Sequence, residues 1–231
     1  MNIYILHLYY DLMNLYGEIG NIKALEKSLE SQKIKVIIDN KTINDEIDFS
    51  KYDLIYIGSG TENNLSIVLD DIKKHKEALE NYIENNKFII STGNSYELFG
   101  KSINGIDALN IFNYKSIKLE KRVVGDIIVK CDFIEENIIG FLNHACKIID
   151  NDTPMFKVIN GIDDYEGFNY KNFYGTYLLG PLLVRNPNLH KYIVTKLIKS
   201  KNKKFKLKKF NFKLDEEAYK TYMNTYHKDI Y

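Results

Sequence analysis

Hydrophobic and polar positions alternate along the first hundred residues between short apolar runs and longer amphipathic stretches. The apolar runs are nearly continuous and rich in β-branched residues, which is typical of strands covered on both faces. They span residues 2–8, 34–39, 53–60 and 87–92. Between them, residues 21–32 and 67–86 carry apolar side chains at helical spacing. This order predicts an α/β fold with right-handed crossovers and a mostly parallel sheet that has helices on both faces.

The second half of the chain has a different pattern. Residues 125–149, followed by 156–161 and 168–181, predict strands joined by turns, and we expect an antiparallel extension of the sheet. Asn186 and Pro187 predict a helix that runs to about residue 200, with Asn186 as its N-cap. Residues 214–231 predict a closing helix whose early acidic residues suit the helix dipole. We therefore expect one domain over residues 1–231, including a helical extension from about residue 199.

Composition narrows the class of protein. With 231 residues, 45% of them hydrophobic and 27% charged, the chain is typical of a globular protein. Its net charge of +1 argues against a nucleic-acid binder. Only Cys131 and Cys146 occur, in no metal-binding spacing, so we expect neither a disulfide framework nor a metal or cofactor. The start has no signal-peptide pattern and no apolar run reaches membrane-spanning length, which favours a cytoplasmic protein.

One charge run stands out, the lysine-rich segment 199–210. It is either a patch for an anionic partner or a solvated connector. We favour the connector, because four apolar side chains interrupt the run and can hold it to the body of the protein: Phe205, Leu207, Phe210 and Phe212.

Three loops are predicted at the carboxyl ends of strands, where parallel sheets gather ligands. They are the glycine-rich stretch 58–63, the turn at Gly93 and the stretch 179–183. The sequence around Gly93, FIISTGNSYELFG, has the strand–turn–helix form in which many enzymes present a nucleophile. Glycine tolerates the backbone of such a turn but has no reactive group. Ser95 is the nearest hydroxyl, and we expect it to cap the following helix.

A nucleophile would also need a base within hydrogen-bonding reach. Two of the five histidines, His75 and His227, lie on charged helical stretches and are expected at the surface, while His7 and His190 are ambiguous. His144 is the only histidine that we expect at a strand end in the second half. None of the five can be assigned as a base from spacing. We expect both cysteines to lie away from the Gly93 turn.

Several motifs in order resemble one family along the whole chain. They are DLMNLYGEIGNIKAL, YIGSGTEN, TGNSYELFGKSI, RVVGDIIV, GFLNHACK and EGFNYKNFYGTYLLGPLL. The chain is similar to the GatD-type class I glutamine amidotransferase subunit of lipid II isoglutaminyl synthase, of the cobyric acid synthase-like family. The resemblance implies a flavodoxin-like α/β fold. It also implies glutamine hydrolysis by a cysteine thiolate with a histidine, without a cofactor, and ammonia supply to a MurT-like ligase that amidates lipid II in cell-wall synthesis.

Carried over residue by residue, the resemblance implies that the chemistry is missing. The family nucleophile position falls on Gly93 and the family base position on Leu179. Asn94 and Ser95 replace two glycines, Ser59 interrupts the glycine-rich loop, and Leu142 replaces a glutamate beside the matching His144. The resemblance assigns substrate binding to Arg122, Gly58, Gly60 and Asn94, with His144 and Ser95 as possible accessory residues.

Three functions remain open at this point. The first is a structural or regulatory subunit that binds a MurT-like ligase without hydrolysing glutamine. The second is a module that binds glutamine or a related small molecule through Arg122 and the glycine-rich loop. The third, which we favour least, is an enzyme with a relocated nucleophile, Ser95 or Cys146 acting with His144.

Overall fold

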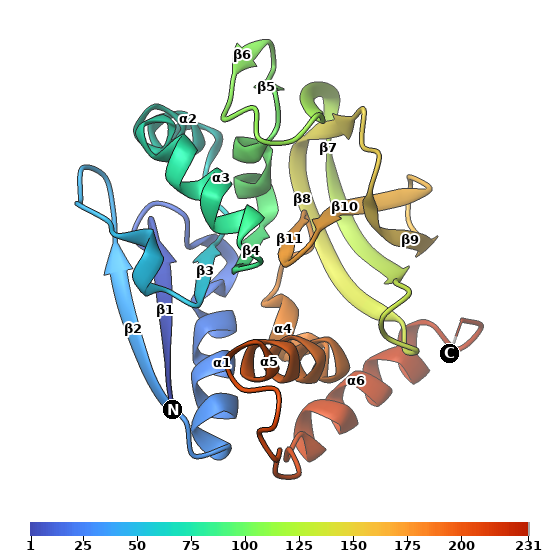
Figure 1. Ribbon diagram of the computed structural model, residues 1–231. Helices are drawn as coiled ribbons and strands as arrows, with labels where there is room; N and C mark the ends of the chain where they lie inside the picture. Colours follow the sequence, from blue (N-terminus) through green and yellow to red (C-terminus); the bar gives the residue numbers. More distant parts are fainter. Residues whose placement is uncertain (231) are drawn as a thin grey trace.

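Five parallel strands form one half of the sheet in the computed structural model, which describes residues 1–230 (Figure 1). Their order in the sheet is β2-β1-β3-β4-β11. The strands are β1 (Asn2–Leu8), β2 (Lys35–Lys41), β3 (Leu54–Ile57), β4 (Phe88–Thr92) and β11 (Phe173–Thr176). The predicted α/β fold class is confirmed. Because these strands are parallel, the loops after β3, β4 and β11 leave the sheet at the same edge, and this edge carries the candidate site.

The other half of the sheet is mainly antiparallel. It continues from β11 through β10 (Tyr165–Tyr170), β9 (Pro154–Asn160) and β7 (Lys115–Lys130), and β7 also pairs with β8 (Ile138–Ile149). A small hairpin of β5 (Ser102–Ile103) and β6 (Ile106–Asp107), which the sequence did not predict, joins the edge of β7. β7 begins ten residues before the predicted strand. Its first part is largely exposed and polar, so it lacks the apolar run by which strands were identified.

The helices are α1 (Ile19–Ser31), α2 (Glu62–Ile72), α3 (Lys76–Glu84), α4 (Leu182–Arg185), α5 (Pro187–Lys201) and α6 (Lys213–Tyr226). Right-handed crossovers that step in opposite directions along the sheet place α1 on one face and the α2–α3 pair on the other (Figure 1).

The prediction of a single helix over residues 67–86 was wrong in two respects. The helix starts at Glu62, where Thr61 Oγ1 accepts a hydrogen bond from Asn64 N, and a 3-10 turn, Lys73–His75, divides it.

Asn186 occupies the predicted N-cap position of α5, but its side chain does not cap that helix. Its Oδ1 accepts a hydrogen bond from Ile139 N at 2.8 Å, and its Nδ2 donates to the carbonyl oxygens of Ile139 and Leu182. Buried backbone groups need such partners. Asn186 therefore fastens the start of α5 to β8.

The last part of the chain packs onto the body of the protein through apolar side chains. α6 places Tyr219 and Met223 against Ile128 and Ile139 of the β7–β8 pair. In the connector between α5 and α6, three of the four predicted apolar residues are partly buried against the main core, and Phe212 is buried: Phe205, Leu207, Phe210 and Phe212. The lysine-rich segment is thus held to the core by these apolar side chains, as the sequence analysis expected.

Candidate functional site at the carboxyl edge of the sheet

Three loops that are distant in the sequence meet at Gly93. This residue follows β4 and begins the 3-10 helix Gly93–Phe99, with a φ of +64°. Only glycine adopts such a left-handed backbone without steric cost. A Cβ atom placed on Gly93 would overlap the side chain of Ser59, from the loop after β3. It would also lie 3.0 Å from Leu179 Cδ2, from the loop after β11. The space above Gly93 is therefore filled.

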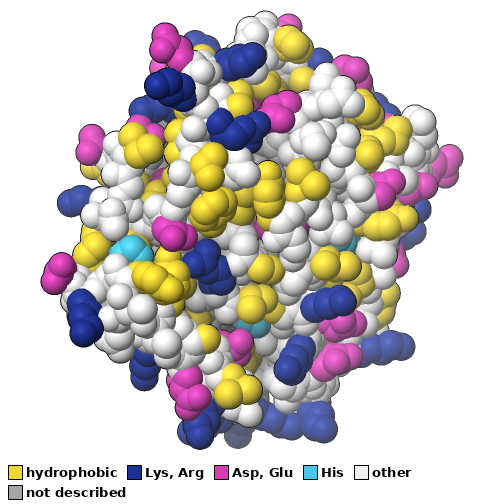
Figure 2. All heavy atoms as spheres, turned by 180° about the vertical axis from the view of Figure 1, so that it is seen from behind, with side chains coloured by type: hydrophobic (Ala, Val, Ile, Leu, Met, Phe, Trp, Pro, Cys, Tyr) yellow, Lys and Arg dark blue, Asp and Glu magenta, His cyan; other side chains and the backbone are white. Residues whose placement is uncertain are grey.

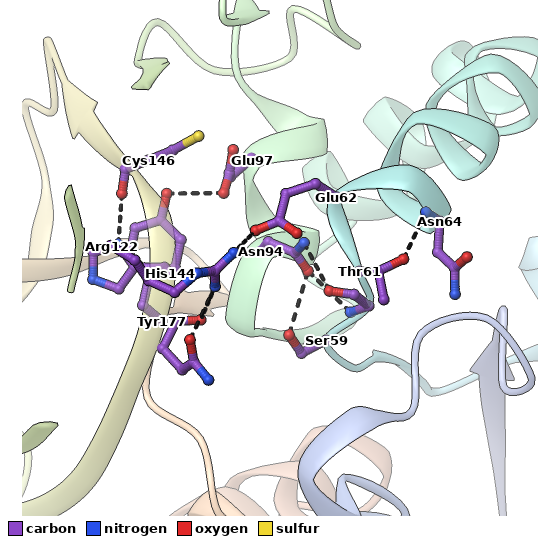
Figure 3. A network of polar contacts seen from close by, with 12 residues as sticks. Ser59, Thr61, Glu62, Asn64, Asn94, Glu97, Arg122, His144, Cys146 and Tyr177 are labelled. Atoms are coloured by element: carbon purple, nitrogen blue, oxygen red, sulfur yellow. Dashed lines mark hydrogen bonds and ion pairs between the residues drawn. The ribbon is translucent and has the colours of Figure 1, made fainter. Parts of the chain in front are cut away.

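Asn94 joins the loop after β4 to the loop after β3. Its Oδ1 accepts a hydrogen bond from Gly60 N at 3.0 Å, and its Nδ2 donates to Gly60 O at 3.0 Å (Figure 3). Ser59 Oγ donates to the same Asn94 Oδ1 at 3.3 Å. One amide side chain thus occupies both backbone groups of Gly60. The N–H of Gly60 is therefore already bonded to Asn94.

The glycine-rich loop needs its glycines for a packing reason. A Cβ atom on Gly58 would overlap the carbonyl oxygen of Met13, and one on Gly60 would overlap the Met13 side chain. The stretch after β1 therefore lies directly against this loop. Glycine is the residue that permits so close an approach of two chain segments.

The structure does not place Ser95 as a helix cap. Its Oγ lies 2.9 Å from the carbonyl oxygen of Thr92, 3.1 Å from that of Ile57 and 2.7 Å from Ser91 Oγ. It is fully buried. A hydroxyl group donates only one hydrogen, so these contacts use the proton that a nucleophile would have to surrender. Ser95 fastens the end of β4 to β3, and the expectation that it caps a helix was wrong.

A cavity of about 410 Å³ opens beside these loops. One face of α2 contributes Glu62, Leu65 and Leu69 to its lining, the β5–β6 hairpin contributes Ile103 and Ile106, and β7 and β8 contribute Arg122, Asn143, His144 and Cys146. Gly60 and Asn94 line it too, whereas Ser95 does not. The predicted residues Arg122, Asn94, Gly60 and His144 are therefore brought together.

Arg122 already has partners at the mouth of this cavity. Its guanidinium forms an ion pair with Glu62 and donates a hydrogen bond from Nη1 to Asn143 Oδ1 at 2.9 Å (Figure 3). Asn143 Nδ2 in turn donates to the Tyr16 hydroxyl at 3.0 Å. A contiguous polar network therefore crosses the mouth. The sequence analysis missed Glu62 and Asn143, although an acidic residue at a helix start just after a glycine-rich loop is a recognisable signal.

His144 lies inside β8, so its predicted position at a strand end was wrong. Its ring stacks on the Tyr177 ring with centroids 3.9 Å apart, and its Nδ1 lies 2.6 Å from the carbonyl oxygen of Cys146 (Figure 3). Burial lowers the pKa of His144. The imidazole is therefore held neutral, with one ring nitrogen occupied by the backbone.

Cys146 lines the same cavity as Asn94. Its Sγ contacts the Asn104 side chain at 3.6–3.7 Å. Burial, together with the nearby Glu97, raises the pKa of the Cys146 thiol. Thiolate is the nucleophilic form, so this environment disfavours reaction. Cys131 does not line the cavity.

Buried carboxyl groups surround the site, and the sequence analysis did not identify them. Glu97 binds Ser116 Oγ and accepts a hydrogen bond from the Tyr177 hydroxyl at 3.0 Å, and burial raises its pKa to about 7. Glu18 lies beneath the Gly93 turn, bonded to Tyr56 and Thr92, and burial raises its pKa to about 7 as well. Polar side chains within otherwise helical or strand patterns gave no signal of these contacts.

No group of three or more His, Cys, Asp or Glu side chains within residues 1–230 is arranged to hold a metal ion. None of the helices described there combines the length and the apolar character needed to cross a membrane.

The chain is similar to two curated proteins over most of its length. It is 32% identical over 210 residues to the GatD subunit of the glutamine-hydrolysing lipid II isoglutaminyl synthase of Streptococcus pneumoniae, covering 85% of this chain and 81% of that protein. It is 29% identical over 224 residues to the same subunit from Staphylococcus aureus, covering 93% and 90%. A glutamine amidotransferase structure from Thermotoga maritima shares the fold, with a TM-score of 0.54, 10% identity and coverage of 95% and 92%.

A second glutamine amidotransferase structure matches with a TM-score of 0.53 and 10% identity, covering 83% of this chain and 98% of that one. A family model for the CobB/CobQ-like glutamine amidotransferase domain matches residues 4–187. That match spans the strands and loops that form the candidate site. The chain belongs to the CobB/CobQ-like glutamine amidotransferase domain family.

Proposed function

We propose that this chain is a GatD-like subunit without glutaminase activity, which binds a MurT-like ligase in the cytoplasm as its structural or regulatory partner in lipid II amidation. The similarity to two GatD subunits over most of their length supports the subunit role. In this proposal Gly93 stands at the nucleophile position and Leu179 at the base position. The ligase then takes ammonia from solution.

The single observation that carries the proposal is the contact of three segments at Gly93. The positions that the resemblance assigns to nucleophile and base lie next to each other in space, as a catalytic pair must. Neither has a reactive group, since one side chain is a hydrogen atom and the other a hydrocarbon. Loss of a nucleophile that acts with its base lowers kcat on the order of 10⁶-fold.

Two neighbouring substitutions support the same conclusion. Ser59 fills the volume in which a side chain on Gly93 would begin. Asn94 holds the Gly60 N–H, one of the backbone donors that would stabilise an oxyanion in the glycine-rich loop. In this proposal the turn therefore lacks a nucleophile and a base. It also lacks space for a side chain on Gly93 and a free backbone N–H at Gly60 for an oxyanion.

A relocated nucleophile has little support. Ser95 is buried outside the cavity. Cys146 and His144 share the cavity, but the pKa of the thiol is raised, and the one His144 contact with this residue is made to its carbonyl oxygen. An activated thiol needs a basic partner that lowers its pKa, whereas burial, together with the charge and the hydrogen bond of Glu97 beside Cys146, raises the pKa of this thiol.

The test measures ammonia release from L-glutamine by the purified chain, alone and with a MurT-like ligase from the same cell. The GatD subunit of Streptococcus pneumoniae with its own ligase is the positive control. We expect no release above a heat-inactivated sample and no adduct on Cys146 after treatment with an electrophilic glutamine analogue. Turnover, or a labelled Cys146, contradicts the loss of activity. Failure to co-purify with any ligase contradicts the subunit role.

A second function, binding of a small amino acid, is favoured by the cavity itself. Arg122 and Glu62 place a cation and an anion side by side at its mouth, which suits the carboxylate and ammonium groups of a zwitterion. Calorimetry with L-glutamine and other amino acids tests this function. We expect Arg122→Ala to lower any affinity at least tenfold. Absence of binding to the wild-type chain ends this candidate.

A further inference from the structure

The connector between α5 and α6 presents a row of lysines on one side of the molecule. We call the five exposed lysines of this row the lysine strip: Lys203, Lys204, Lys206, Lys208 and Lys209. The apolar residues that alternate with them, Phe205 and Leu207, are turned toward the core. Dark blue side chains gather along the lower edge of Figure 2, where Figure 1 places this connector.

The strip is held in place by specific hydrogen bonds. The buried Gln32 side chain binds both backbone groups of Lys208: its Oε1 accepts from Lys208 N at 2.7 Å, and its Nε2 donates to Lys208 O at 3.2 Å. Asn202 Oδ1 accepts from Lys204 N at 3.0 Å. Lys199 Nζ donates to the carbonyl oxygen of Phe205 at 2.7 Å. The lysine side chains are thereby directed outward on an ordered backbone.

The charge of the strip is not neutralised locally. Residues 199–210 contain seven lysines and no acidic residue, in a chain whose net charge is only +1, so the rest of the chain is net negative. Lys201 pairs with Asp53. Within residues 1–230, none of the five strip lysines has an ion-pair partner. Lys33 and Lys35, which follow Gln32 in the chain, are also exposed and add to the positive surface.

We propose that the lysine strip docks the protein onto an anionic lipid surface. A membrane leaflet with acidic headgroups attracts clustered lysines without requiring a shaped pocket, and no lysine of the strip lines the cavity described above. Leu214, at the start of α6, is 78% exposed beside this segment and supplies an apolar side chain for the lipid interface. The segment has no arginine and turns its phenylalanines inward, so it lacks the forked donors and stacking surfaces with which proteins hold nucleic acid.

The experiment measures co-sedimentation of the intact protein with vesicles of equal parts phosphatidylcholine and phosphatidylglycerol, and with phosphatidylcholine vesicles. We expect binding to the anionic vesicles alone, weakening as salt rises because exposed charges are screened. The triple variant Lys203→Glu, Lys206→Glu, Lys209→Glu should bind about a hundredfold more weakly. The matched control, Lys118→Glu, Lys121→Glu, Lys130→Glu, changes the net charge equally at exposed lysines of β7 and should bind as the wild type does.

The outcomes separate the possible partners. Leu214→Ser should weaken vesicle binding and leave any binding to duplex DNA unchanged. Equal weakening by both triple variants would show that net charge, and not the strip, determines binding, and would overturn the proposal. So would absence of binding to anionic vesicles at low salt, or tighter binding to duplex DNA than to vesicles. Thermal melting of each variant checks that its fold is intact.

Discussion

The side chain of Ser59 occupies the position at which a side chain on Gly93 would begin. The two residues belong to loops after neighbouring parallel strands, β3 and β4, and are brought together because those loops leave the sheet at the same edge. The fit between a residue without a side chain and a neighbour that fills the space explains why the turn is tightly packed. It also shows that Gly93 cannot be substituted alone without cost.

The first prediction concerns that cost. Gly93→Ala should lower the free energy of unfolding by about 1–3 kcal/mol more than Gly105→Ala. Both glycines have a positive φ, +64° and +83°, but Gly105 has open space around its Cβ position. The difference between the two losses of stability therefore measures the cost of the overlap between the new Cβ atom and Ser59. Urea denaturation measures it, and adding Ser59→Gly to Gly93→Ala should recover most of the loss. Equal losses at the two glycines would mean that backbone strain alone matters.

The second prediction concerns repair of the proposed active site. The double variant Gly93→Cys, Leu179→His should remain inactive toward glutamine, because Ser59 crowds the new thiol and Asn94 still holds the Gly60 N–H. Adding Ser59→Gly and Asn94→Gly frees both, and ammonia release should then exceed that of the double variant at least tenfold.

The control for this repair is the quadruple variant with serine in place of the introduced cysteine, which should be inactive. An active double variant would show that the neighbouring substitutions do not obstruct the site. Inactivity of a well-folded quadruple variant would place the obstacle elsewhere in the pocket.

The third prediction concerns the amide bridge between the two loops. Asn94→Ala leaves the backbone N–H and C=O of Gly60 without their present partner. We expect the free energy of unfolding to fall by about 1–3 kcal/mol, the usual cost of unpaired buried polar groups. Asn63→Ala is the control, since Asn63 is exposed in the same segment and should change stability by less than about 0.5 kcal/mol. Equal effects of the two changes would contradict the role of the bridge.

The fourth prediction concerns pH. Burial raises the pKa of Glu97 to about 7, above the ordinary value of 4.5 that it regains on unfolding. The folded protein therefore holds a proton that the unfolded chain releases, and this carboxyl makes stability fall as pH rises from about 4.5 to 7. Glu97→Gln should remove that fall, so the variant should gain stability relative to the wild type between pH 5 and pH 8.

Between pH 5 and pH 8, the informative quantity is the difference in the free energy of unfolding between the Glu97→Gln variant and the wild type. Burial lowers the pKa of His7 and His190 to about 4, below their ordinary 6.5, and these neutral histidines make stability rise with pH over the same interval. Denaturant titrations give the free energy of unfolding of the wild type and the variant at each pH, and subtracting one from the other cancels the histidine contribution that both share. A pH-independent difference would show that Glu97 titrates normally.

The sequence predicted the parts of the fold that depend on local patterns. The apolar runs of β1, β3 and β4 identified buried parallel strands, and Gly93 identified a left-handed turn. The run of β2 identified a strand, but β2 lies at the edge of the sheet and is only half-buried. The beginning of β7 was missed because its exposed residues, such as Lys118 and Glu120, resemble a loop. The break between α2 and α3 was missed because the apolar spacing continues across it.

The site was predictable only where a motif named its residues. Arg122 and Asn94 were identified from the resemblance, and the structure places both at one cavity. The partner of Arg122 is Glu62, 60 residues away, and nothing local to either position links them. Likewise the contact between Ser59 and Gly93 depends on the register of β3 against β4, which the sequence does not show.

The interlocking of Ser59, Asn94 and Leu179 around Gly93 has an evolutionary consequence. Any lineage in which this turn acquired a side chain would first pass through crowded, less stable intermediates, since Ser59 and Leu179 leave no space for a Cβ atom at Gly93. Selection against those intermediates therefore favours retention of glycine at position 93 together with its present neighbours.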